Sequence, residues 1–146
     1  METDWSGLLR SRDGAAIEIL SDIAGIGRPG ARFRHIRRRH ARDGQPFLLA
    51  NEYLGEHLAA RITPLVLRTK TALKLIAGIQ GVRIADSRQT LTIGMADVET
   101  AAAPHLPLNA PIAHVLRATT NLRGVLLLVA EEIYRGDMVR IDITLR

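Results

Sequence analysis

Apolar and polar residues alternate along two stretches on either side of the turn sequence Arg42-Asp43-Gly44. Because alternation is typical of a strand with two different faces, we expect a β-hairpin over residues 32–54. With a three-residue loop and Gly44 in the left-handed conformation, Arg38 pairs with Leu48. One face of the hairpin then mixes charged and aliphatic side chains, as a polar pocket would need: Arg34, Ile36, Arg38, His40, Leu48, Ala50, Glu52 and Leu54.

The pattern after the hairpin predicts three helices and four strands. The expected helices cover residues 56–61, 71–80 and 95–103. Thr71 is the expected N-cap of the second helix, and Pro104 ends the third. The expected strands cover residues 82–93, 112–119, 125–134 and 139–145.

Short turns join the last three predicted strands, so these strands should form an antiparallel meander. We therefore expect a single domain with an α+β fold, in which helices flank a largely antiparallel sheet. Residues 1–30 carry a weaker pattern, with one short strand expected at residues 15–20 before the Gly/Pro-rich stretch 25–30. We interpret them as an N-terminal extension and linker, and residues 31–146 as the folded unit.

The amino-acid composition excludes several classes of function. The chain has 146 residues, of which 47% are hydrophobic and 24% charged, so it can bury one core as an ordinary globular domain. It has no cysteine, which excludes disulfides, thiolate nucleophiles and cysteine zinc sites. The five histidines show no metal-binding spacing, and we expect neither a metal nor another cofactor. With no membrane-length apolar run and no signal-peptide pattern, we expect a cytoplasmic protein.

The net charge of +5 is concentrated in one stretch. Seven of the twenty Lys and Arg residues fall there: Arg28, Arg32, Arg34, Arg37, Arg38, Arg39 and Arg42. The simplest interpretation is a solvated face that meets acidic residues of a second subunit. Nucleic-acid binding is an alternative, although only Phe33 and Phe47 offer aromatic stacking nearby.

Four local motifs follow one another in a characteristic order. They are Asp43-Gly44-Gln45-Pro46, the segment 71–81, the strand-to-helix joint at 89–100, and Tyr134-Arg135-Gly136-Asp137 before a terminal strand. From about residue 31 to residue 145 this order resembles the UTRA domain, the C-terminal half of HutC-type transcription regulators in the GntR superfamily. The resemblance implies a fold similar to chorismate lyase, a small-molecule effector and a homodimer. DNA contact would come only from a winged-helix domain, for which the roughly thirty residues before the hairpin are too few.

The resemblance also implies ligand-binding roles for five residues. Sugar-phosphate-sensing members carry two arginines two positions apart on the first hairpin strand, and Arg38 and His40 stand at these places. A guanidinium suits carboxylate or phosphate, whereas a histidine suggests a weaker or pH-sensitive contact. Thr71 replaces a serine that starts the central helix, Glu131 aligns with the catalytic glutamate of chorismate lyase, and Tyr134 matches a tyrosine at the end of a strand.

Three departures from the family pattern bear on the effector. Ala50, Leu73 and Leu128 stand where sugar-sensing members carry polar groups. We therefore expect a small anionic effector with a carboxylate group, such as an aromatic or short aliphatic acid. We do not expect an enzyme, but a chorismate-lyase-like activity using Arg38 and Glu131 is an alternative. Arg38 also has a purely structural alternative, a salt bridge to Glu52 on its own face.

Overall fold

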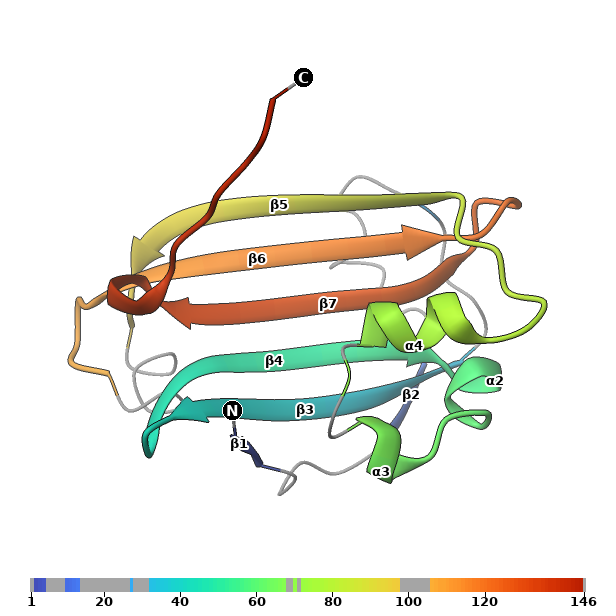
Figure 1. Ribbon diagram of the computed structural model, residues 1–146, viewed down its shortest axis with the longest axis horizontal. Helices are drawn as coiled ribbons and strands as arrows, with labels where there is room; N and C mark the ends of the chain where they lie inside the picture. The colour runs from blue at the N-terminus through green and yellow to red at the C-terminus, as the bar shows by residue number, and fades with distance from the viewer. Residues whose placement is uncertain are drawn as a thin grey trace.

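The computed structural model describes residues 2–4, 10–13, 27, 32–67, 70, 72–97 and 106–145. Within them, one antiparallel sheet carries the fold, in the strand order β1-β3-β4-β7-β6-β5, and β2 also pairs with β3 (Figure 1). The predicted α+β class is therefore confirmed. The strands are β1 (Glu2–Asp4), β2 (Arg10–Asp13), β3 (Arg32–Arg42), β4 (Gln45–Gly55), β5 (Asp86–Met95), β6 (Pro111–Thr120) and β7 (Leu126–Arg135).

The β3–β4 hairpin forms as predicted, but its register differs. Arg38 pairs with Ala50, not with Leu48, because the turn contains two residues in the left-handed region, Asp43 with φ of 50° and Gly44 with φ of 76°. An irregularity between His40 and Ala41 absorbs the remaining offset. The difference is two residues, and a shift of two leaves every side chain on its predicted face.

Three short helices follow the hairpin: α2 (Glu56–Ala59), α3 (Pro64–Leu67) and α4 (Ala72–Gly78). The first and last confirm the predicted helices at 56–61 and 71–80 in shorter form, whereas α3 was not expected. The helices lie beside the sheet near the β3–β4 side (Figure 1). Leu58 of α2 and Ile76 of α4 are fully buried against Ile36, Leu54 and Leu128 of the sheet. None of the described helices is long and apolar enough to span a membrane.

Several predicted elements differ from the structure. The strand predicted at 82–93 begins only at Asp86 and continues to Met95, where a helix was expected to begin. Ala96 and Asp97 are not helical, and the rest of that predicted helix lies outside the described residues. The short strand expected at 15–20 also lies outside them.

The terminal strand predicted at 139–145 is wrong. After the 3-10 turn η1 (Gly136–Met138), residues 139–145 belong to no strand and lead away from the sheet (Figure 1). The alternation of Val139, Ile141, Ile143 and Leu145 is a strand pattern, but a strand needs a neighbour to pair with. No described part of this chain lies beside the segment as a paired strand.

Candidate functional site

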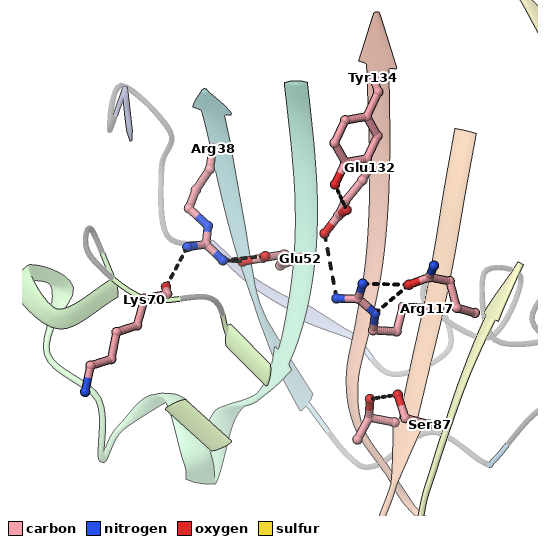
Figure 2. A network of polar contacts seen from close by, with 9 residues as sticks. Arg38, Glu52, Lys70, Ser87, Arg117, Glu132 and Tyr134 are labelled. Atoms are coloured by element: carbon pink, nitrogen blue, oxygen red, sulfur yellow. Dashed lines mark hydrogen bonds and ion pairs between the residues drawn. The ribbon is translucent and has the colours of Figure 1, made fainter. Parts of the chain in front are cut away.

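A group of charged and polar side chains gathers on the sheet face that α4 covers at one end. Arg38 comes from β3, Glu52 from β4, Arg117 from β6, and Glu132 and Tyr134 from β7 (Figure 2). The register explains the grouping, because Arg38 pairs with Ala50 and Ala50 pairs with Glu132 across three adjacent strands. Residues that alternate along a strand share a face, so Glu52 and Tyr134 lie on the same side. We call these five residues the polar cluster.

The centre of the polar cluster is a buried ion pair. Arg38 and Glu52 are only 3% and 5% exposed, and Nη2 of Arg38 donates to both carboxylate oxygens of Glu52. Nη1 of Arg38 donates to the backbone oxygen of Lys70 at 3.1 Å, just before α4. Burial raises the pKa of Glu52, and the Arg38 guanidinium opposes this shift. The alternative predicted from sequence, a salt bridge between these two residues, is therefore confirmed.

A second set of contacts surrounds Glu132. The Tyr134 hydroxyl donates to Oε2 of Glu132 at 2.6 Å, and Nη1 of Arg117 lies 3.9 Å from Oε1. Arg117 also donates from Nε and Nη2 to the side-chain oxygen of Gln89, at 3.1 and 2.6 Å. Burial raises the pKa of Tyr134, and the Glu132 carboxylate raises it further. The phenol consequently remains a hydrogen-bond donor across the physiological pH range.

His40 lies at the edge of the same face, where it pairs with Leu48, which in turn pairs with Tyr134. Burial lowers the pKa of His40 from its ordinary value of 6.5, and the positive charge of Arg38 lowers it further. The imidazole is therefore neutral at pH 7. Its Nδ1 is buried and has no hydrogen-bond partner in the described structure. Buried polar atoms without a partner are uncommon in folded proteins.

The lowered pKa of His40 predicts a specific pH dependence of stability. In the unfolded chain the imidazole takes up a proton near its ordinary pKa of 6.5, whereas the folded chain resists protonation until lower pH. The free energy of unfolding should therefore fall as the pH decreases below about 6.5. Urea unfolding between pH 7 and pH 5 should show a smaller fall for His40→Gln. The exposed His57→Gln variant is the control, and equal slopes for both variants would contradict the assignment to His40.

The structure brings three of the five predicted site residues together and separates one. Arg38, His40 and Tyr134 share a face. Glu131 lies on the opposite face, where Oε2 is 3.2 Å from Nε2 of His114. Placing Glu131 beside Arg38 is therefore wrong, because adjacent residues of a strand point to opposite sides. Thr71 lies outside the described residues.

Sequence reasoning gave no ligand role to Arg117 or Glu132, which the structure places in the polar cluster. The sequence could have indicated Glu132, because it stands two residues before Tyr134 and alternate residues of a strand share a face. Two of the residues that depart from the family pattern have different surroundings. Ala50 lies between Arg38 and Glu132, whereas Leu128 is part of the core beneath α4. Among the residues described, no three His, Asp or Glu side chains are grouped so that they could hold a metal ion.

The basic stretch on β3 divides between the two faces and the strand ends. Arg32 and Arg34 lie 3.4 and 3.6 Å from the Glu56 carboxylate, while Arg37 is exposed. The guanidinium carbon of Arg42 lies 5.5 Å from the ring centroid of Phe47. The stretch is thus partly engaged in local contacts instead of forming one continuous cationic surface.

A family model described as the UTRA domain matches residues 27–140. The chain belongs to the UTRA family. This match covers the β3–β4 hairpin, the described helices and strands β5, β6 and β7, and it confirms the resemblance seen in the sequence. No curated protein sequence matches the chain.

Solved structures show that the fold is that of known regulator domains. YydK from Bacillus subtilis, described as a possible transcriptional regulator, is 14% identical with a TM-score of 0.76, over 99% of this chain and 62% of that chain. A GntR-family regulator from Enterococcus faecalis is 15% identical with a TM-score of 0.74, over 97% and 99%. The C-terminal domain of the histidine utilization repressor from Pseudomonas syringae is 13% identical with a TM-score of 0.76, over 99% and 98%. The UTRA chain described here thus spans 62% of the length of the B. subtilis regulator.

Proposed function

We propose that this UTRA domain senses a small anionic metabolite for a GntR/HutC-type transcription regulator. The observation that carries the proposal is the buried Arg38 guanidinium, held by Glu52 and the Lys70 carbonyl on the same face as Tyr134 and His40. Membership in the UTRA family and the regulator structures that share the fold support it. DNA would be read by a winged-helix domain joined to such a sensor, and not by the residues described above.

The surroundings of Arg38 suggest how a carboxylate effector would bind. In the polar cluster two arginines already face two glutamates, so an added anion must share or replace the contact between Arg38 and Glu52. Burial has raised the pKa of Glu52, and a second carboxylate beside it would raise that pKa further. Effector binding would then be accompanied by uptake of a proton at Glu52. An aromatic or aliphatic group of the effector would contact the apolar neighbours on this face: Leu48, Ala50, Ala113 and Val115.

The test is a thermal-melting screen with aromatic and short aliphatic carboxylates, sugars and sugar phosphates. A ligand that binds only the folded state raises the melting temperature, and saturation at 100 times Kd stabilises by about 2.7 kcal/mol. We expect carboxylates to be the hits. Calorimetry of a hit in two buffers with different ionisation enthalpies should show proton uptake. A sugar phosphate as the sole hit would refute the carboxylate assignment.

Tyr134→Phe locates the effector within the polar cluster. The anionic group of the effector would take over the hydroxyl hydrogen bond that now goes to Glu132, so loss of the hydroxyl should weaken the affinity for the hit about tenfold. Tyr53→Phe is the matched control, because Tyr53 stacks on His35 on the opposite face. Equal affinities for the two variants would place the effector elsewhere. Release of 4-hydroxybenzoate from chorismate would contradict a purely sensory role.

We also propose that the domain forms a homodimer through its C-terminal residues. Ile141, Ile143 and Leu145 are 54%, 75% and 88% exposed, and they alternate with polar residues as in a strand. β5 is the last strand of the described sheet, and its Ile93 and Met95 are also largely exposed. The residues 139–145, which we call the tail, would pair with β5 of a second copy, because an open edge strand is a template for another strand.

A further inference from the structure

A second candidate site lies on the outer side of α4, away from the sheet. It is a groove of about 260 Å³ between α4 and the segment that runs from the end of α2 through α3. Its apolar lining includes Ile62, Leu75 and Ile79, which pack against the core beneath them. Ile76, on the other side of α4, is fully buried against the sheet core. The groove therefore opens to solvent over an apolar floor.

Three cationic residues line this groove: Arg61, Lys70 and Lys74. No acidic side chain is among the described residues that line it. Nη2 of Arg61 donates to the backbone oxygen of Gln80 at 3.1 Å, which connects the guanidinium to the turn after α4. A concave site that is lined by positive charges over an apolar floor concentrates anions. It favours those anions that carry an apolar group.

Lys70 separates this groove from the polar cluster. Its backbone oxygen accepts from Arg38, while its side chain extends away from Arg38 (Figure 2) and lines the groove. The two places therefore lie on opposite sides of the chain at Lys70. A ligand in the groove would contact none of the five residues of the polar cluster, because none of them lines it.

We propose that the groove is a second binding site, for a small organic anion with a short apolar chain. The ammonium groups of Lys70 and Lys74 would bind the anionic group, and Ile62, Leu75 and Ile79 would contact the chain. Its volume is slightly below the range of sites that bury drug-sized ligands, roughly 300–1,000 Å³, which limits the occupant to a metabolite-sized molecule. The proposal is independent of the effector proposed for Arg38.

The experiment is an NMR titration of the whole chain with hexanoate, observed at the methyl groups of Ile62, Leu75 and Ile79. We expect saturable shifts of these methyl signals, and affinity that falls as the salt concentration rises. Hexanamide, which has the same chain without the charge, should bind at least fivefold more weakly. Unsaturable shifts, or equal binding of hexanamide, would overturn the proposal.

Three variants locate the site. K70Q/K74Q should weaken hexanoate binding at least fivefold and leave the Arg38 contact to the backbone of residue 70 intact. R83Q/R123Q removes two positive charges outside the groove and should bind hexanoate within twofold of the wild type. Tyr134→Phe should also leave the titration unchanged, so failure of the effector proposal and failure of this one remain distinguishable. Equal losses in the K70Q/K74Q and R83Q/R123Q proteins would show general charge attraction and refute a site in the groove.

Discussion

Glu52→Ala is expected to lower the free energy of unfolding by about 3–5 kcal/mol, because it leaves the buried Arg38 charge without its counter-ion. Arg38 is 3% exposed, and a neutral water molecule in the space left by the carboxylate would not neutralise its charge. Only the 3.1 Å contact from Nη1 to the Lys70 carbonyl would remain of its hydrogen bonds described above. Urea unfolding at pH 7, followed by far-UV circular dichroism, measures the change.

Two further variants separate burial of charge from loss of packing. Arg38→Met combined with Glu52→Leu removes both charges and fills similar volume, so we expect most of the stability to return. Glu56→Ala removes a carboxylate whose partners Arg32 and Arg34 are on the surface, and should cost about 0–1 kcal/mol. If Glu52→Ala were as mild as Glu56→Ala, the pair would not be buried as the structure shows.

The alternation of residues was enough to predict which hairpin side chains share a face. The register was not predictable to the same degree, because it depends on the turn. Asp43 adopts a left-handed conformation as well as Gly44, which shortens the loop to two residues. Asp is one of the few non-glycine residues that tolerate this conformation, so the sequence was compatible with either loop.

The residues of the candidate site were predictable only in part, because the face of a strand residue depends on its exact position. Family resemblance indicated Arg38 and Tyr134, and these residues do share a face. It also indicated Glu131, but Glu132 is the carboxylate in the polar cluster. A shift of one position in the alignment is enough to move a strand residue to the opposite face. The contact between Arg38 and the Lys70 carbonyl depends on how the chain enters α4, which no local pattern encodes.

Short elements were the least predictable. β1 and β2 have three and four residues and exist only because β3 offers them an edge. The opposite case is the tail, which has strand-forming residues but no strand neighbour among the described residues. In both cases pairing, not composition, decides whether a segment becomes a strand. The tail is therefore a strand-forming segment that no described strand of the chain pairs with.

We propose that the strand partner of the tail is a second copy. The tail spans about 23 Å when fully extended, at roughly 3.3 Å per residue. The tail starts after η1, which lies against β6, so reaching the outer edge of its own β5 takes about two strand spacings, about 9 Å, and leaves about four residues to pair, fewer than the tail contains. Figure 1 shows the C-terminus beyond the β5 edge of the sheet. Reciprocal exchange of tails between two copies would pair both and close the assembly with two-fold symmetry.

Removal of residues 139–146 is accordingly expected to convert a dimer into a monomer, with a dissociation constant raised at least about 100-fold. Burying the apolar side chains of each tail contributes about 1.5–3 kcal/mol per large residue, and the exchange occurs twice, so the expected loss exceeds this threshold. Sedimentation equilibrium over a range of concentrations measures it. The sheet should remain folded by circular dichroism, because residues 139–145 belong to no strand.

Point variants test whether the tail acts as a strand. Ile143→Lys places a charge among the apolar residues of the tail and should dissociate the dimer, as should Ile93→Lys on β5. Thr144→Lys introduces the same charge one position later, on the opposite side of an extended segment, and should leave the mass unchanged. A wild-type chain that sediments as a monomer at millimolar concentration would contradict the exchange. So would a dimer that tolerates Ile143→Lys and Thr144→Lys equally, because only a paired strand distinguishes neighbouring positions in this way.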